Sequence, residues 1–174
     1  PQVRFFLMGV LLATLASSLW AVMHLGLPFD VAFREALFNI ASISTGTGFF
    51  SGTFAGWEGP VLVIAFIVGF LGGCSGSSTG AMSSFRVLLT LHILSARIRQ
   101  IQSPSRIIPI RYDGRPVARD VVESLMLFMT AFLFGMGVFA TAITLTGVDS
   151  FSALMGAWMA LGNIGYGFGP LVAA

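Results

Sequence analysis

The sequence predicts an all-α integral membrane protein built from a repeated unit. Of its 174 residues, 56% are hydrophobic and only 9% are charged, whereas soluble domains carry about 25% charged residues. The mean hydropathy is +0.91, and at roughly 20 apolar residues per span this length allows about three to five membrane crossings. One order of parts occurs twice: a long span, an acidic helix cap, a short helix and a glycine-rich strand. Such internal repetition indicates a repeat architecture.

The first unit begins with a span expected over residues 5–23, which contain no charged side chain. At 1.5 Å per residue they reach about 28 Å, enough to cross the hydrocarbon core. Residues 29–44 follow a turn and are too short and too polar to span, so we expect a half-helix with Asp30 as its N-cap. Residues 45–52 combine glycine and hydroxyl side chains without an apolar face. This composition predicts non-helical backbone.

The returning helix of this unit is expected to be broken. Residues 60–71 are apolar but reach only about 18 Å before small residues interrupt them at 72–80. We expect the helix to resume at Ala81 and to continue through residue 98, with Arg86 inside it.

An arginine-rich segment separates the two units. All nine basic residues of the chain are arginines. Six of them lie in residues 97–119, where prolines and the pair Asp113-Gly114 predict an exposed loop with a turn. The positive-inside bias places this loop in the cytoplasm, so both glycine-rich strands enter the membrane from outside. The outer side would attract a cation, because it carries Asp30, Glu35, Glu58 and Asp149 against Arg34 alone.

The second unit repeats this order. A span is expected over 121–145, Asp149 and Ser150 cap a short helix over 151–162, and a second glycine-rich strand follows over 163–170. We expect this unit to be cut short before its returning helix. The expected domains are the first unit (1–98), the cytoplasmic linker (99–119) and the second unit (120–174).

No pattern indicates an enzyme. The single cysteine, Cys74, excludes a disulfide within the chain and a cysteine-rich metal site. The two histidines, His24 and His92, lie near the end of one span and within a separate helix, so no catalytic pair can be argued from them. We therefore expect neither catalytic residues nor a cofactor.

Two glycine-rich strands at membrane depth predict a path for an ion. Non-helical backbone is tolerated there only where it is buried in protein or lines a watery cavity. In potassium channels a Thr-Val-Gly-Tyr-Gly loop directs carbonyl oxygens at the ion in place of water, and residues 163–167 match its Gly-Tyr-Gly spacing. The alternative is that the glycines only allow tight turns between helices.

Pairing Gly48 with Gly165 places an aromatic residue after each glycine, and we prefer it to pairing Gly46 with Gly165. The ion would be held by backbone carbonyls and not by a side-chain metal site. The candidate filter residues are Thr47, Gly48, Phe49, Asn163, Ile164, Gly165 and Tyr166.

The small-residue break predicts a gate beneath the strands, on their cytoplasmic side. Nine consecutive small residues exceed what a close helix-packing seam, the alternative interpretation, requires. Arg86 is the one arginine predicted at membrane depth. We give equal weight to two interpretations: it takes part in the gate, or its side chain extends to the cytoplasmic surface. The candidate gate residues are Gly72, Gly73, Cys74, Ser75, Gly76, Ser77, Ser78, Thr79, Gly80 and Arg86.

These features together resemble the Trk/Ktr/HKT superfamily of potassium transporters, and within it the bacterial TrkH-type membrane subunit. The resemblance covers essentially the whole chain. It rests on SISTGTGFFS at 42–51, GFLGGCSGSSTGAMSSFRV at 69–87, PSRIIPIRYDGRPV at 104–117 and ALGNIGYGFGP at 160–170.

The resemblance implies four M1–pore-helix–filter–M2 units around one pore, as in potassium channels. This chain would supply the third unit, with a broken M2 helix, and the first two-thirds of the fourth. It implies uptake of K⁺ through a carbonyl filter with an intramembrane gating loop, by a multi-pass protein of the bacterial inner membrane. The implied partners are the remaining repeats of the same pore, a second copy in a homodimer, a cytoplasmic nucleotide-binding regulatory subunit and membrane lipid, but no nucleic acid.

Two other functions stay open. A secondary transporter would use broken helices for a site at the membrane midplane and predicts inverted repeats, whereas the two units here share one orientation if both spans begin inside. A non-conducting membrane scaffold would use the small residues as packing seams, and its strands would tolerate substitution.

Overall fold

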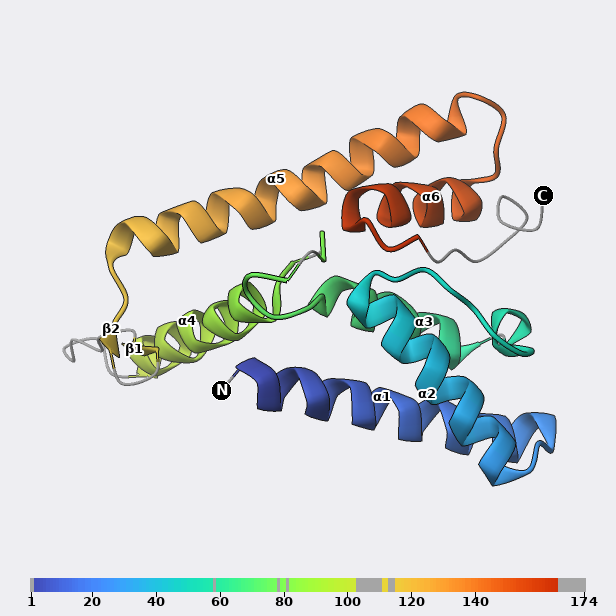
Figure 1. The fold of residues 1–174 in the computed structure, drawn as a ribbon. Helices are drawn as coiled ribbons and strands as arrows, with labels where there is room; N and C mark the ends of the chain where they lie inside the picture. The colour runs from blue at the N-terminus through green and yellow to red at the C-terminus, as the bar shows by residue number, and fades with distance from the viewer. Residues whose placement is uncertain are drawn as a thin grey trace.

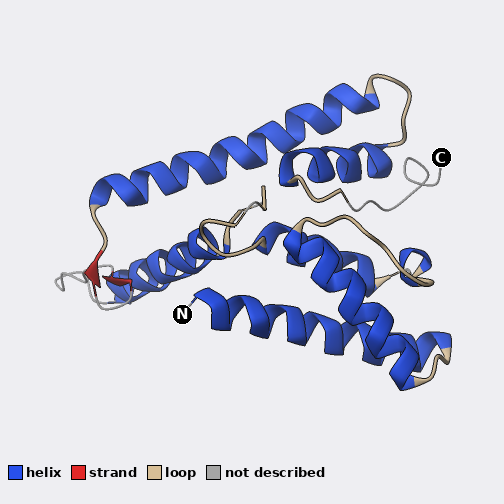
Figure 2. Ribbon diagram, viewed as in Figure 1, coloured by secondary structure: helices blue, strands red, loops and turns tan. Residues whose placement is uncertain are grey.

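The computed structural model describes residues 2–57, 59–77, 79–80, 82–102, 111–112 and 115–165. Within these ranges the regular secondary structure is helical apart from one short hairpin (Figure 1, Figure 2). The elements are α1 (Gln2–Leu25), α2 (Phe29–Thr45), the 3-10 turn η1 (Phe54–Gly56), α3 (Pro60–Leu71), α4 (Ser84–Gln102), β1 (Arg111–Tyr112), β2 (Arg115–Pro116), α5 (Arg119–Thr144) and α6 (Ser150–Gly162).

Two helices of the described chain, α1 and α5, are long and apolar enough to cross a membrane, each with a mean hydropathy of 2.0 over its most apolar window. They correspond to the spans expected over 5–23 and 121–145. Figure 1 shows them at opposite edges of the molecule with α2, α3 and α6 between them, and both begin on the side where the hairpin lies. The two units therefore run in the same direction.

The returning helix of the first unit is broken as predicted, but its second half is displaced along the chain. α3 ends at Leu71, whereas α4 begins at Ser84 and not at Ala81, and it continues to Gln102 and not to residue 98. The first residues of the expected basic loop over 97–119 are therefore helical. Arginine and glutamine favour helices, and Arg99 in the last turn complements the helix dipole.

The described part of the linker packs on α4. β1 and β2 pair antiparallel, and the turn expected between them at Asp113-Gly114 falls outside the described residues. The Tyr112 ring lies 5.0 Å from the Phe85 ring of α4, edge to face. This contact extends a small apolar cluster between α4 and α5, which contains Leu89, Ile93, Val122 and Leu125.

The main core lies where α1, α2, α3 and α6 meet. Small side chains line the contact of α1 with α2, and small residues at membrane-helix interfaces let backbones approach closely. Trp57 and Trp158, both 1% exposed, are the largest fully buried side chains. This packing fixes α2, and with it the start of the strand that follows α2. The buried small residues include Ala13, Thr14, Ser17 and Ala21 of α1 and Ala32 and Ala36 of α2.

The two half-helices begin differently. The N-cap of α2 is Pro28, with no side-chain cap bond, so the prediction that Asp30 caps this helix is wrong. Pro28 presets the backbone entering the helix with φ −58°. Asp30 lies in the first turn instead, where its charge still favours the helix dipole.

In α6, Asp149 is the N-cap as predicted, and Ser150 is the first helical residue. The Asp149 carboxylate accepts a hydrogen bond from the Ser152 N–H at 3.0 Å. Ser152, through its side chain and then through its N–H, holds the pKa of Asp149 below its ordinary value. The N–H is the better-defined donor, because the Ser152 hydroxyl makes no hydrogen bond of ordinary geometry.

Candidate functional site

The two predicted filter strands leave their helices through the same backbone turn. At the end of α2, Gly46 has φ 72°, and the next N–H donates to the carbonyl five residues earlier at 3.0 Å. At the end of α6, Asn163 has φ 48°, and the next N–H donates to the equivalent carbonyl at 3.1 Å. Both are helix ends of the Schellman type. The residues that follow therefore leave the two helices in equivalent directions.

Two residues further on, Gly48 and Gly165 face each other. Their φ angles of 80° and 66° lie in the left-handed region that favours glycine. A Cβ on Gly48 would lie 3.0 Å from the Gly165 carbonyl carbon, and one on Gly165 would lie 3.3 Å from the Gly48 Cα. A Cβ on Gly46 would similarly lie 3.0 Å from the Asn163 carbonyl oxygen. The strands thus lie side by side in one direction, in the register that pairs Gly48 with Gly165.

The other candidate filter residues offer backbone groups and hydroxyls in place of acidic side chains. Ile164 is 1% exposed and packs in the core, while Phe49 is 70% exposed. The Thr47 hydroxyl lies 2.6 Å from the Thr45 hydroxyl. Tyr166 falls outside the described residues. Among the residues that are described, no group of three His, Cys, Asp or Glu side chains could hold a metal.

A buried asparagine on α2 holds the outer part of the first strand. The Asn39 side chain is fully buried. Its amide nitrogen donates to the Ser51 carbonyl at 2.9 Å and to the Glu35 carbonyl at 2.8 Å, and its oxygen accepts from the Ser51 N–H at 3.1 Å. Both backbone groups of Ser51 are therefore paired by one side chain. Asn39 was not among the residues predicted from the sequence. A polar residue inside the otherwise apolar run ALFNI could have identified it as a candidate for a buried polar contact.

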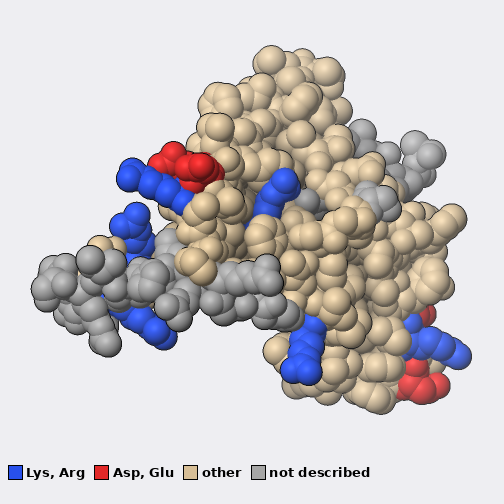
Figure 3. Space-filling view, turned by 60° about the vertical axis from the view of Figure 1, so that its left-hand side comes forward, with Lys and Arg blue, Asp and Glu red and all other residues tan. Residues whose placement is uncertain are grey.

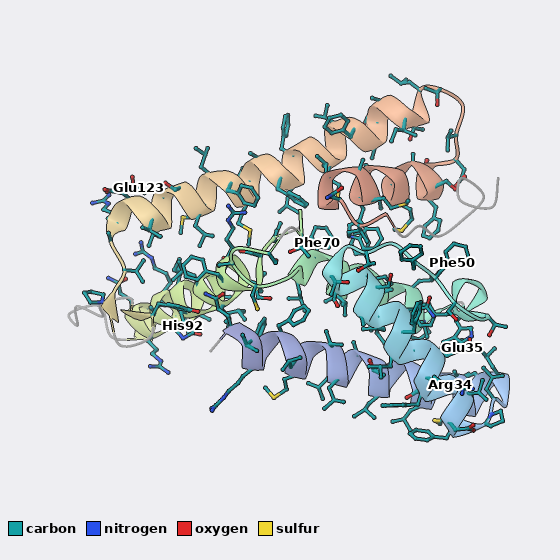
Figure 4. All side chains as sticks on the ribbon, in the orientation of Figure 1. Arg34, Glu35, Phe50, Phe70, His92 and Glu123 are labelled. Atoms are coloured by element: carbon teal, nitrogen blue, oxygen red, sulfur yellow. The ribbon has the colours of Figure 1, made fainter. Side chains whose placement is uncertain are left out.

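One turn earlier on α2, Glu35 holds the same strand at a second point. Its carboxylate accepts from the Thr53 N–H at 2.8 Å and from the Thr53 hydroxyl at 3.0 Å. The Thr53 hydroxyl in turn accepts from the Trp57 indole N–H at 3.0 Å. Figure 4 shows Glu35 at the end of the molecule where the loop carrying Phe50 passes α2. Glu35 was expected only as part of the outer charge, and its role as an acceptor for the strand is a finding of the structure.

Hydroxyl groups connect the two ends of the predicted gating loop through hydrogen bonds. The Thr79 hydroxyl accepts from the Gly73 N–H at 3.0 Å and lies 2.7 Å from the Ser77 hydroxyl. The buried Ser84 hydroxyl, at the start of α4, donates to the Gly72 carbonyl at 3.0 Å. These bonds pair polar groups that would be costly to expose to lipid.

The middle of the loop reaches the start of α1. The Ser75 N–H donates to the Gln2 side chain at 3.3 Å. Cys74 is a free thiol of intermediate exposure, and a Cβ on Gly76 would meet nothing within 4 Å. Ser78 falls outside the described residues.

The end of the loop touches the beginning of both strands. A Cβ on Gly80 would lie 2.6 Å from the Asn163 Cβ, and the Thr79 methyl lies 3.8 Å from the position of a Cβ on Gly46. Gly46 and Asn163 are the first residues of their strands, so the loop lies at the ends where the strands leave α2 and α6. The structure therefore brings the predicted filter and the predicted gating loop together.

Arg86 lies elsewhere. Its guanidinium is 3.8 Å from the centroid of the Phe128 ring on α5, a cation–π geometry. Asp120 and Ser124 help to line the same crevice of about 300 Å³ between α4 and α5. Arg86 is the third residue of α4, the helix that follows the loop. Its side chain contacts an aromatic ring of α5 and so links α4 to α5.

Charged side chains are sparse on the surface. Figure 3 shows a largely uncharged face with acidic side chains at two well-separated places. Exposed large apolar side chains are frequent on α1 and α5, and none of the most apolar window of α5 is buried within the molecule. This distribution fits a chain that lies among lipid and other membrane helices.

Comparison with solved structures gives the same architecture. The chain superposes on the crystal structure of the potassium transporter TrkH from Vibrio parahaemolyticus with a TM-score of 0.90 and 30% sequence identity, over 98% of this chain and 37% of that one. The all-helical membrane fold predicted from the sequence is thereby confirmed.

Comparisons of sequence agree. The chain is 32% identical over 171 residues to the Trk system potassium uptake protein TrkI of Halomonas elongata, covering 98% of this chain and 35% of the relative. It is 31% identical over 173 residues to TrkH of Vibrio parahaemolyticus, covering 98% and 36%. The chain thus spans about a third of the length of these relatives. Residues 10–174 also match the model of the TrkH family of cation transport proteins. The chain therefore belongs to the TrkH family, whose members are membrane transporters and not enzymes.

Proposed function

We propose that this chain forms two sides of a pore for K⁺ uptake, in which the strands beginning at Gly46 and Asn163 present backbone carbonyls to the ion. The observation that carries the proposal is the parallel approach of Gly48 and Gly165, at positions where a Cβ would be strained by the positive φ and would crowd the opposite strand. Carbonyl rings replace the hydration shell of K⁺ in channels. The choice of K⁺ as the ion rests on the relatives reported above, which are named as potassium uptake proteins.

Two strands enclose an ion on two sides only, so the proposal requires further repeats of the same kind. We assign residues 1–98 to the third repeat, 99–119 to a cytoplasmic linker and 120–174 to the first part of the fourth repeat. The common direction of the two units and of their strands supports this arrangement over the inverted repeats of a secondary transporter. The extra hydrogen bonds on the first strand support it over a scaffold with simple packing seams.

We further propose that residues 72–80 form the gate, because they contact the beginning of both strands. The complete pore would lie in the bacterial inner membrane, with a homodimeric partner and a cytoplasmic nucleotide-binding regulatory subunit, as the family resemblance implies. K⁺ is its transported ion, and neither a cofactor nor a nucleic acid is part of the proposal.

The test is uptake in a host that lacks its own K⁺ uptake systems. The complete gene product containing residues 1–174 should restore growth at limiting K⁺, whereas residues 1–174 alone should not. Gly165→Ser should abolish uptake or lower the preference for K⁺ over Na⁺ while membrane expression stays the same. Unchanged K⁺ and Na⁺ fluxes in this variant would overturn the assignment of the filter.

A further inference from the structure

We propose that Asn39 and Glu35 are positioning residues that hold the first filter strand and thereby set its preference among cations, an inference that rests on the proposed function. The strand leaves the C-terminus of α2 and returns beside it. Ser51 and Thr53 thus meet side chains that lie 12 and 18 residues earlier in the chain. Asn39 and Glu35 are four residues apart and share one helix face. We call the contacts Asn39–Ser51 and Glu35–Thr53 the strand clamp.

The Asn39 half of the clamp replaces a missing backbone ladder. A strand inside a membrane protein has no neighbouring strand or water to pair its N–H and C=O groups unless the protein supplies partners. Asn39 supplies a donor and an acceptor to one residue, Ser51, from a fully buried position. Leucine at this position would keep the volume but leave both Ser51 groups unpaired. Aspartate would keep the acceptor and lose the donors.

The Glu35 half fixes the turn that ends the strand. Its carboxylate takes two hydrogen bonds from Thr53, and charge-assisted bonds of this kind are stronger than neutral ones. Gly52 has φ 69°, and a Cβ there would collide with the Glu35 carboxylate. The turn therefore fits closely over the carboxylate, and its positive φ favours glycine at position 52.

Among the residues that the structure describes, the clamp contacts only the first strand. The described part of the second strand is anchored by an apolar side chain instead, since Ile164 is buried next to Gly162 and Gly69. In the first strand the residue after Gly48 is Phe49, whose side chain is 70% exposed and therefore anchors the strand little. Ser51 is only three residues beyond Gly48, so the clamp holds the strand close to Gly48.

Selectivity should depend on this anchor. A set of carbonyls separates K⁺ from the smaller Na⁺ through the geometry and field of the oxygens around the ion. If the strand is released at Ser51, the Gly48 carbonyl can approach a smaller ion, so the preference for K⁺ should fall while flux continues. Gly165→Ser distorts the backbone itself and can abolish uptake altogether, whereas release of the clamp should leave flux intact.

The experiment uses the complete gene product containing residues 1–174, purified and reconstituted in liposomes. Competitive fluxes of ⁸⁶Rb⁺ and ²²Na⁺ give the preference, and hydrogen exchange of the peptide containing Ser51 and Thr53 reports the clamp itself. We expect Asn39→Leu to lower the preference for Rb⁺ over Na⁺ by at least about fivefold, which corresponds to the free energy of one net hydrogen bond. Exchange at Ser51 should accelerate by a similar factor. Glu35→Gln should lower the preference by a smaller factor.

Matched controls separate the clamp from general effects. Ser44→Ala removes a buried hydroxyl that bonds only within α2. Asp30→Asn removes one negative charge from the first turn of the same helix. Both should keep the wild-type preference. If Asn39→Leu fails to fold, Thr53→Val removes the hydroxyl between Glu35 and Trp57 and should give the smaller Glu35→Gln effect.

The outcomes are distinguishable. A wild-type protein that carries no Rb⁺ flux would overturn the proposed function, while the exchange measurement would still decide whether the clamp holds the strand. A conducting protein whose Asn39→Leu and Glu35→Gln variants keep the wild-type preference would overturn the inference alone. An equal loss of preference in Asp30→Asn would assign the effect to outer charge and would also overturn it.

Discussion

Gly80 lies against Asn163 so closely that a Cβ on Gly80 would be 2.6 Å from the Asn163 Cβ and 3.1 Å from the Gly162 carbonyl oxygen. This contact joins the last residue of the small-residue loop to the first residue of the second strand. The loop is otherwise held by hydroxyl groups such as those of Thr79 and Ser84. Segments with few apolar contacts have low local stability, so we expect that the loop can be displaced without unfolding the helices around it.

The first prediction follows from this contact. Gly80→Ala should push the loop away from the strand and raise the basal flux of the complete gene product, with the preference among cations unchanged because the backbone at Gly48 and Gly165 is not altered. Flux in liposomes measures both quantities. Gly135→Ala on α5, where a Cβ would meet nothing within 4 Å, is the control and should behave as wild type. Loss of folded protein without any gain in flux would identify the loop as a packing seam.

The second prediction concerns the link between α4 and α5. Arg86→Gln and Phe128→Leu should each lower the thermal stability of the protein, and the double variant should be less destabilised than the sum. The coupling should be about 0.5–2 kcal/mol, the range of cation–π contacts. A double-mutant cycle in detergent measures it. Strictly additive effects would show that the two side chains do not support each other.

The sequence predicts the parts of the fold that have a compositional signal. Long apolar runs locate α1 and α5, consecutive small residues locate the break after Leu71, and an acidic residue before an apolar run locates the cap at Asp149. The pairing of Gly48 with Gly165 is also accessible, because it depends only on aligning two repeats. The spans, the break and the cap are local features, so one segment at a time is enough to find them, whereas the glycine pairing needs both repeats.

Other features arise from contacts between distant segments or from competing local preferences. Pro28, and not Asp30, starts α2, because a fixed φ is sufficient there without a side-chain cap. The arginines after residue 96 suggest a loop by their charge, yet arginine is a good helix former and α4 continues to Gln102. Asn39 and Ser51 are 12 residues apart across a turn, and only the return of the strand along α2 brings them together.

The third prediction tests the orientation in the membrane. In a background with Cys74→Ser, a cysteine introduced as Asp113→Cys should react with an impermeant thiol reagent only from the cytoplasmic side. Gly56→Cys, at a position with open space around the Cβ, should react only from outside. The reason is the excess of arginine in residues 97–119. The reverse labelling pattern would invert the whole topology.

The fourth prediction uses the cap of α6. Because the pKa of Asp149 is lowered in the folded protein, its charged form stabilises the fold above the pKa of the unfolded chain. This contribution is lost as the pH falls through the folded pKa. Asp149→Asn should therefore melt below wild type at pH 7, and the two melting temperatures should converge at acidic pH. Scanning fluorimetry across this range is the measurement, and a gap that widens on acidification would contradict the cap.

Locating the ion shows whether the carbonyls of the two strands hold it. Crystals of the complete gene product grown in Rb⁺ should show an anomalous peak beside the backbone carbonyls at the level of Gly48 and Gly165, and crystals of Gly165→Ser grown in the same way should lack it. An Rb⁺ peak bound instead to the Glu35 carboxylate, or one that persists unchanged in Gly165→Ser, would contradict the account.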